Sequence, residues 1–360
     1  MVDWSKLPDL VAVALLACAF ASVAHRGHNR ASVFWLTGWV MIAFHFAAFM
    51  FLSAPGIWGA LASFLGLAPL AGAGLLFMWA AIPFRTEHTS RWMFASLLGT
   101  IVFYIGILTL TSAPHWALNF AAILLGVLPL AIALIALQRF SHPLRWVTVA
   151  LSAALSIFLL AFQNQPGNGA SLALNGIMFT VFFGCCINFF ATYRRATSGA
   201  LVTISGFLAW AAVFAVAPSM SAFLPNVHLE SEVWNLPKYV VAVGMILLLL
   251  EDQIEHNRFL ALHDELTGLP NRRLFQNRLA IALERARRSG AEAALLLVDL
   301  DHFKRVNDSL GHHMGDMLLK HVASLLAGRP PLRYRRSNRG RRVLSDSGRA
   351  DQPSGSFACR

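Results

Sequence analysis

Charged residues and paired cysteines are both scarce in this sequence of 360 residues. Asp, Glu, Lys and Arg make up 13% of it and hydrophobic residues 57%, whereas soluble domains carry about 25% charged residues. The four cysteines, Cys18, Cys185, Cys186 and Cys359, show neither metal-binding nor disulfide spacing. The composition therefore argues against an ordinary soluble enzyme and against a disulfide-stabilised secreted domain, and it indicates a membrane protein.

The net charge of +11 does not indicate nucleic-acid binding. Nine arginines and only two acids lie in residues 329–360, and most other basic residues lie in short loops or in the C-terminal third. Residues 329–360 are rich in Arg, Ser, Gly and Pro without a helix or strand period, so we expect a basic disordered tail there. We expect no nucleic acid among the partners.

Nine apolar segments precede Glu251, and most reach the roughly 20 residues that a helix needs to cross a bilayer. They predict a polytopic α-helical membrane domain of about nine spans over residues 1–250. The expected segments are 7–24, 32–52, 57–84, 92–110, 116–137, 146–162, 170–190, 199–224 and 239–250.

Arginines mark every second loop between these segments. The loops with odd numbers carry Arg26, Arg30, Arg85, Arg91, Arg139, Arg145, Arg194 and Arg195. No Lys or Arg occurs in the alternate loops, at 53–56, 111–115, 163–169 and 225–236. Because positive residues mark cytoplasmic loops, we expect the N-terminus outside and everything after residue 250 in the cytoplasm. The first segment has basic residues after its apolar run, the wrong flank for a cleaved signal peptide.

Few polar residues interrupt the segments: His45, Asn119, Asn175 and Asn188. An ionisable residue in a membrane span is a functional candidate, and His45 could bind a proton, a metal or a haem. No obvious second His ligand lies in another span, so a hydrogen bond between helices is the favoured interpretation. The sequence does not identify a stimulus or ligand for this domain.

Two carboxylates follow a short apolar run in the C-terminal third. Residues 293–298 have the length and the bounds of a strand buried on both faces of an α/β core. Asp299 and Asp301 would lie on one face at its end, where carboxylates can hold Mg²⁺ together with substrate phosphates. The alternative is an ordinary core strand that ends in solvated aspartates.

Two motifs together closely resemble the first half of the GGDEF domain of the diguanylate cyclase family. They read DELTGLPNRR at 264–273 and DLDHFKRVNDSLGHHMGD at 299–316. The resemblance covers residues 264–328, less than half of a complete domain. It implies a partial α/β, nucleotidyl-cyclase-like domain that takes part in the condensation of two GTP into cyclic di-GMP. It also implies a homodimer and, with the spans, a protein of the bacterial inner membrane.

The resemblance further implies a magnesium site and a GTP site. It assigns the metal to Asp299 and to the backbone carbonyl of Leu300. The residues that it assigns to GTP are Phe303, Lys304, Asn307, His312 and Asp316. Among these, the Phe303 backbone and Lys304 would meet phosphate, and Asn307 and Asp316 would read guanine. Asp301 matches the motif without a certain role.

Local patterns predict the elements around these residues. Asn271 is the expected N-cap of a helix that ends at Gly290, a helical turn follows at 302–308, and Gly311 permits a tight turn. A second helix is expected over 315–327, with Leu318, Val322, Leu325 and Leu326 buried, and Gly328 closing it. Residues 251–263 fit a short dimeric coiled coil that continues the last span, with Leu247, Leu250, Ile254, Asn257 and Ala261 on its seam. An ordinary amphipathic linker helix is the alternative.

The Gly-Gly-Asp/Glu-Glu-Phe motif that completes the family's site is absent from the chain, so no catalytic residue is identifiable. We therefore expect little or no cyclase activity from the chain as written. Asn-Arg-Gly-Arg-Arg-Val-Leu at 338–344 can be encoded so that the same bases, read one position forward, give Thr-Gly-Gly-Asp-Glu-Phe. This predicts a shift of reading frame between Gly328 and Arg333.

Two other functions compete with a sensory cyclase whose gene continues in the other frame. The chain could be a catalytically dead membrane receptor or dimerisation module that keeps a remnant of the cyclase fold. It could also be a transport protein with an incidental tail, although transport predicts facing intramembrane charges or broken helices, and the sequence shows few.

Overall fold

The computed structural model describes residues 2–26, 31–81, 88–111, 114–135, 143–193, 197–223, 231–327, 334–336 and 342–344. The chain divides into two compact units, Met1–Gln253 and Ile254–Arg360. The sequence places the end of the membrane domain at residue 250, close to this division.

Nine long helices make up the described part of the first unit, each at a predicted apolar segment. They are α1 (Leu7–Arg26), α2 (Ala31–Phe49), α3 (Ile57–Ala81), α4 (His88–Leu110), α5 (His115–Ile135), α6 (Pro143–Phe162), α7 (Gly169–Thr192), α8 (Ser198–Phe223) and α9 (Ser231–Leu262). Among the described residues, eight of these helices are long and apolar enough to cross a membrane, and α6 has a shorter apolar stretch, Trp146–Phe162. The expectation of a polytopic helical domain is therefore confirmed in coarse form.

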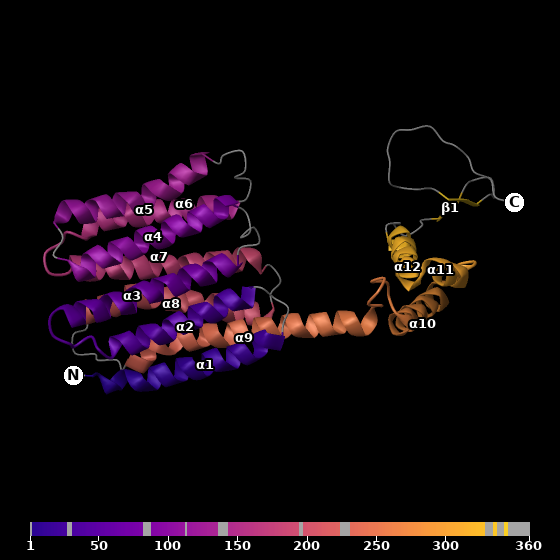
Figure 1. Ribbon diagram of the computed structural model, residues 1–360, viewed down its shortest axis with the longest axis horizontal. Helices are drawn as coiled ribbons and strands as arrows, with labels where there is room; N and C mark the ends of the chain where they lie inside the picture. The colour runs from indigo at the N-terminus through magenta and orange to yellow at the C-terminus, as the bar shows by residue number, and fades with distance from the viewer. Residues whose placement is uncertain are drawn as a thin grey trace. The chain divides into compact units, whose positions relative to one another are not determined.

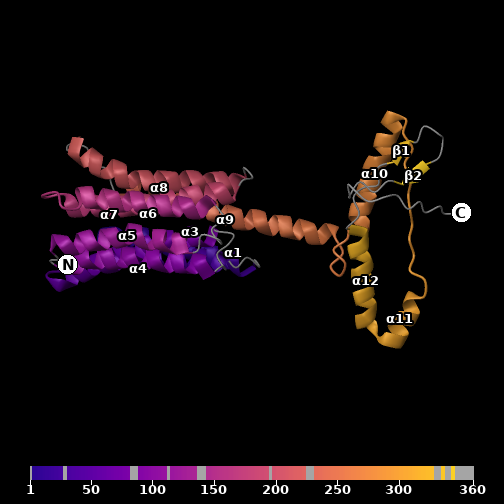
Figure 2. The same ribbon diagram turned by 90° about the horizontal axis from the view of Figure 1, so that it is seen from above.

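The helices of the first unit form two layers. Helices α1 to α5 follow one another across one layer, and α6 to α9 return across the second (Figures 1 and 2). Consecutive helices from α1 to α8 pack against each other, and α3 and α4 also contact α7 across the layers. Short connections place sequence neighbours side by side and antiparallel, so the chain's order alone accounts for most of the contacts.

Large aromatic side chains fill the core between the layers. Trp35 stacks on Phe189 at 5.8 Å between ring centroids, and Phe182 stacks on Trp210 at 3.9 Å. Small residues let helices approach where no aromatic ring separates them: a Cβ on Gly244 would lie 2.6 Å from the backbone nitrogen of Thr203. Close approach at small residues is a common way for membrane helices to associate, because lipid supplies little hydrophobic drive between them.

The second unit contains three further helices and two short strands: α10 (Arg272–Ser289), α11 (Phe303–Leu310), α12 (His312–Ala327), β1 (Tyr334–Arg336) and β2 (Arg342–Leu344). The predicted cap of α10 is confirmed, because the side chain of Asn271 accepts hydrogen bonds from the backbone of Arg273 and Leu274. Gly290 follows the helix in the left-handed conformation at φ 67°, which glycine adopts without steric cost. The turn at Gly311 is also confirmed, with φ 83°.

The strand expected at 293–298 does not form. Residues 291–300 are irregular, and Leu296 and Leu297 are 86% and 94% exposed instead of buried. A strand needs a neighbouring strand for its backbone groups, and among the described residues the two strands pair only with each other and not with 293–298. The α/β character expected for this unit therefore stays a prediction.

Helix α12 differs from its prediction in extent and in burial. It begins at His312 and not at residue 315, and α11 runs on to Leu310. Leu318 and Val322 are half-buried, but Leu325 and Leu326 are exposed, and Gly315 and Ala323 are the residues of α12 that are buried. Leu325 and Leu326 therefore lie on the surface of the described part of this unit. Gly328, the expected end of the helix, lies outside the described residues.

The two strands pair antiparallel, with Tyr334 opposite Leu344 and Arg336 opposite Arg342. They fall within 329–360, where the sequence shows no strand period, and most of that segment lies outside the described residues. Tyr, Val and Leu in these six residues supply the side chains that favour a pleated surface.

The last helix of the first unit continues without a break into the stalk segment, as the sequence predicts. Helix α9 runs through Ser231–Leu262, so residues 251–262 are helical. Ile254 on the expected seam is 66% exposed. Pairing of this seam with a second chain stays a prediction.

Candidate functional site

The stretch 264–273 forms a closed turn between α9 and α10. The backbone nitrogen of Asp264 donates to the carbonyl of Leu269 at 2.8 Å, and the nitrogen of Gly268 donates back to the carbonyl of Asp264 at 2.8 Å. The carboxylate of Asp264 accepts from the backbone nitrogen and the hydroxyl of Thr267, at 2.9 and 2.6 Å. These bonds from Thr267 hold the pKa of the Asp264 carboxyl below its ordinary value, because they favour the charged form.

Asn271 ties this turn to both flanking helices. Its Oδ1 caps α10, its Nδ2 donates to the carbonyl of Ala261 at 2.9 Å, and its backbone nitrogen donates to the carbonyl of Leu262 at 2.9 Å. One side chain thus satisfies free backbone groups at the end of one helix and at the start of the next. The stretch therefore acts as a structural joint, and the predicted site residues lie downstream of it.

The second motif places two of its predicted site residues against α12. Phe303 and Asn307 lie on α11, and a side chain at Gly315 would run into the Oδ1 of Asn307 and the ring of Phe303. Glycine at 315 is what permits α11 and α12 to pack here. The structure thus brings Phe303 and Asn307 together at this contact, and Asp316 follows Gly315 directly in sequence.

The loop before α11 contains the predicted metal and phosphate groups. His302 adopts the left-handed conformation at φ 59° and precedes the helix. The backbone nitrogen of Phe303 donates to the carbonyl of Leu300 at 3.3 Å. The N–H assigned to phosphate is therefore hydrogen-bonded to the carbonyl assigned to the metal. The Leu300 carbonyl oxygen keeps a second lone pair that is available to a cation.

The remaining predicted side chains are open to solvent. Asp299, Lys304, His312 and Asp316 are exposed. Within the described residues no group of three or more His, Cys, Asp or Glu is close enough to hold a metal. The oxygen donors of Asp299 and Leu300 match the chemistry of Mg²⁺, which needs few protein ligands when phosphates supply others, and they make up only part of its ligand shell.

Residues 261–329 match the family model described as diguanylate cyclase, GGDEF domain. This segment of the chain belongs to the GGDEF family. The GGDEF segment starts three residues before the first motif and ends at the beginning of the basic tail. Its helices α10, α11 and α12 all fall inside the match.

Curated relatives support this identification over the same share of the chain. The bifunctional diguanylate cyclase/cyclic di-GMP phosphodiesterase MucR of Pseudomonas aeruginosa is 43% identical over 99 residues, 23% of this chain and 14% of MucR. Diguanylate cyclase DgcP of the same species is 46% identical over 76 residues, 21% of this chain and 11% of DgcP. Response regulator PleD of Caulobacter vibrioides is 41% identical over 78 residues, 22% of this chain and 17% of PleD.

The chain spans less than a fifth of the length of each of these relatives. No solved structure is significantly similar to it. The family is therefore shown for the GGDEF segment.

A buried polar cluster in the first unit was not predicted from the sequence. Asp9 of α1 and Asn235 and Lys238 of α9 are each less than 10% exposed, although they lie among apolar residues. The available signal was an acid, Asp9, inside the first apolar segment and a lysine, Lys238, directly before the last one. By contrast, His45 behaves as predicted: its Nδ1 lies 3.0 Å from the carbonyl of Gly66, which links α2 to α3.

Proposed function

We propose that this protein is a membrane-bound sensory member of the diguanylate cyclase family, whose GGDEF segment belongs to a unit that condenses two GTP into cyclic di-GMP in signalling. The observation that carries the proposal is the family match over 261–329 directly after a bundle of long apolar helices. The curated names of DgcP and MucR include diguanylate cyclase, and the shared segment supports the same reaction class here.

The GTP site is proposed to form around the loop that joins residue 299 to α11. Asp299 and the carbonyl of Leu300 would hold Mg²⁺, and the backbone of Phe303 with Lys304 would meet the phosphates. Bound Mg²⁺ would stabilise the charge on the transferring and leaving oxygens. Asn307, His312 and Asp316 would surround the guanine, and the packing of Asn307 against Gly315 supports a fixed position for its amide.

The membrane orientation is proposed from the arginine pattern of the loops. The arginines of the odd loops support an N-terminus outside the bacterial inner membrane and a GGDEF segment in the cytoplasm. GTP is available there, so the orientation and the family agree. The lipid bilayer is then a partner of the first unit.

Dimerisation is proposed to occur through the stalk that continues α9. Ile254, Asn257 and Ala261 are exposed on this helix. Cyclisation of two GTP needs two GGDEF domains face to face, each with one nucleotide. A parallel pair of stalks would bring two chains into that arrangement, and a stimulus on the first unit would act through it.

The second candidate function is a catalytically dead receptor that keeps the GGDEF remnant for nucleotide binding or dimerisation. The absence of the GGDEF motif from the sequence and the irregular, exposed stretch 291–300 favour it. Under either function, we propose that the 360-residue chain forms little or no cyclic di-GMP, because the acids of the motif are missing.

Binding of GTP to the full chain tests the proposed site. The chain in nanodiscs is equilibrated with labelled GTP and Mg²⁺, and the bound nucleotide is counted. We expect saturable, Mg²⁺-dependent binding that Asp299→Ala and Lys304→Met weaken. The control Arg305→Met, which removes the next exposed cation in the sequence, should leave binding unchanged. Equal binding by all variants, or no binding by the parent chain, would show that these residues do not form a GTP site.

A further inference from the structure

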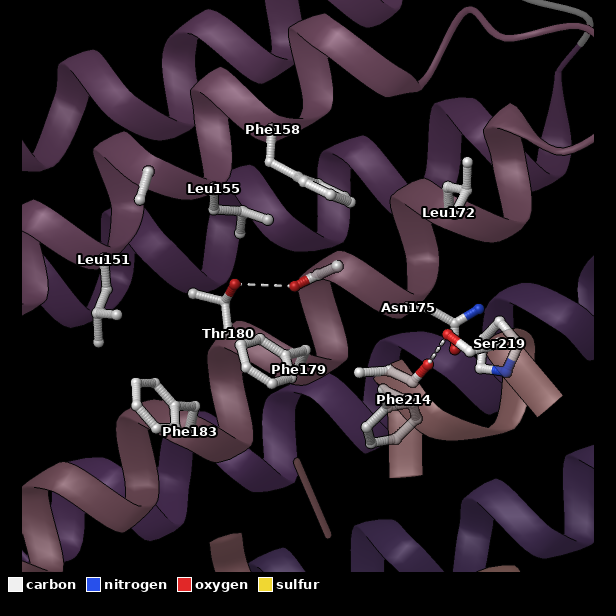
Figure 3. A pocket seen from close by; sticks show the side chains of 14 residues that line it. Leu151, Leu155, Phe158, Leu172, Asn175, Phe179, Thr180, Phe183, Phe214 and Ser219 are labelled. Atoms are coloured by element: carbon white, nitrogen blue, oxygen red, sulfur yellow. Dashed lines mark hydrogen bonds between the residues drawn. The ribbon is translucent and has the colours of Figure 1, made fainter. Parts of the chain in front are cut away.

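A pocket of about 510 Å³ lies between α6, α7 and α8 of the first unit (Figure 3). Its walls are apolar and aromatic, with four phenylalanines from the three helices: Phe158, Phe179, Phe183 and Phe214. The volume falls in the range usual for small-molecule sites, which are also mostly apolar with a few polar groups. The pocket lies beside the hydrophobic core, because Leu155 belongs to the core and Phe158, Phe183 and Phe214 pack against it.

The pocket is long and has one polar end. Asn175 and Ser219 lie together at that end, and Leu151 and Phe183 lie toward the other (Figure 3). Along α7 the lining runs from Leu172 to Phe183, about 16 Å at the rise of an α-helix. That length is about half of the ~30 Å hydrocarbon core of a bilayer, the depth of one acyl chain.

The polar groups of the lining have already used their hydrogen-bond donors. The amide of Asn175 donates to the carbonyl of Ser171 at 2.8 Å and to its hydroxyl at 3.3 Å. The hydroxyls of Thr180 and Ser219 donate to the carbonyls four residues earlier, at 2.8 and 2.7 Å.

What remains in the pocket is a set of acceptors. Asn175 keeps its Oδ1, and the hydroxyl of Ser219 keeps lone pairs. Among the lining residues that the structure describes there is no Asp, Glu, Lys, Arg or His, so none of them would compensate a charged group in the pocket.

We propose that this pocket binds a single-chain amphiphile whose head is uncharged and donates a hydrogen bond, such as a long-chain alcohol or a monoacylglycerol. The chain lies against the four phenylalanines, and the head hydroxyl donates to the acceptors near Asn175. An ionised fatty acid is disfavoured, because a carboxylate only accepts hydrogen bonds and carries charge. This proposal goes beyond the cyclase function and does not depend on it, because it concerns binding to the first unit alone.

Photolabelling of the full chain in nanodiscs tests the proposal. The probe is dodecanol that carries a diazirine in its chain, and labelled peptides are located by mass spectrometry. We expect saturable labelling of α6, α7 and α8 that unlabelled dodecanol competes away and that dodecanoate at pH 8 competes at least about fivefold less well, the effect of about one neutral hydrogen bond. Labelling that does not saturate, or equal competition by the carboxylate, would overturn the proposal.

Two variants and a control distinguish the pocket from the general lipid surface. Ala215→Phe fills the pocket and is expected to remove the saturable labelling, whereas Ala209→Phe, at an exposed position on the same helix outside the pocket, is expected to leave it. Asn175→Leu keeps the cavity and removes the acceptor. It should therefore lower the affinity for the alcohol probe about fivefold and leave the affinity for an alkane that carries a diazirine unchanged. If Ala209→Phe and Ala215→Phe lower labelling equally, or if Asn175→Leu has no effect on the alcohol, the proposed site is wrong.

Discussion

The Nδ2 of Asn235 donates a hydrogen bond to Oδ2 of Asp9 at 2.7 Å, and it joins the first long helix of the chain to the last helix of the same unit. The other carboxylate oxygen of Asp9 accepts from the hydroxyl of Tyr239 at 2.8 Å. The amino group of Lys238 donates to Oδ1 of Asn235 and lies 4.6 Å from the ring centroid of Phe46. Two donors of α9, the Asn235 amide and the Tyr239 hydroxyl, therefore bond one buried carboxylate of α1, and Lys238 joins the cluster through Asn235.

This cluster predicts energetic coupling between α1 and α9. Asp9→Ala leaves Asn235 and Tyr239 without their acceptor, and we expect it to lower stability by about 1–3 kcal/mol. In a double-mutant cycle with Asn235→Ala the two effects should couple by about 1 kcal/mol, since interacting buried partners are not additive. The measurement is thermal unfolding of the four proteins in one detergent. Ser22→Ala, an exposed residue of α1, serves as the control, and purely additive effects of the pair would contradict the cluster.

The contact between α11 and α12 predicts a preference for glycine at 315. A methyl group there meets the Oδ1 of Asn307, so Gly315→Ala should destabilise the pair of helices by about 1–3 kcal/mol through overpacking. Hydrogen exchange of the α11 amides measures the effect. Asn307→Gly should restore part of the protection in the Gly315→Ala background, because it removes the obstructing amide. Ser324 is exposed on α12, so the control Ser324→Ala should leave the exchange of the α11 amides unchanged. Unchanged exchange in Gly315→Ala would exclude the packing described.

The turn at Asp264 predicts a dependence on acid. The carboxyl has a folded pKa below its ordinary value of 3.8 because of its bonds from Thr267. The contribution to stability is therefore complete above the unfolded pKa and is lost as the pH falls through the folded pKa. Protection of the Thr267 amide, corrected for the intrinsic exchange rate, should drop below about pH 4. In Asp264→Asn the same drop should be absent, and an identical pH profile for both proteins would rule out this carboxylate as its cause.

The predicted shift of reading frame between Gly328 and Arg333 can be tested in the nucleotide sequence of the gene. The family match ends at residue 329, within the interval where the sequence predicts a frame shift. The codons for 338–344, read one base forward, should give Thr-Gly-Gly-Asp-Glu-Phe. Sequencing of the gene through this region measures it. Any other amino acids in that frame would favour the dead receptor as the function of this chain.

The helices of both units could be predicted from the sequence because their signals are local. Apolar length located the long helices, and Asn271 and Gly290 located the ends of α10. Two features of the second unit could not be predicted from local signals, because they depend on other parts of the chain. The strand at 293–298 has a local pattern but needs a partner strand to form, and the leucines at 325 and 326 need a core to cover them.

Long-range pairing explains the other missed features. Asp9 and Asn235 are 226 positions apart, so the burial of a carboxylate in α1 becomes interpretable only when α9 lies beside it. The pocket between α6, α7 and α8 likewise depends on three helices whose lining residues look like ordinary lipid-facing side chains in sequence. The family motif succeeded where these failed because its residues lie close together in the chain.

Cyclic di-GMP formation by a chain with the rest of the GGDEF domain restored tests the central claim most directly. The claim is that Asp299 holds the metal of a magnesium–GTP complex. We predict that Asp299→Ala lowers product formation by at least about a hundredfold, the order of loss seen when charge stabilisation of a transition state is removed, while Ser309→Ala leaves it unchanged. Undiminished product from the Asp299→Ala protein would show that the chemistry lies elsewhere.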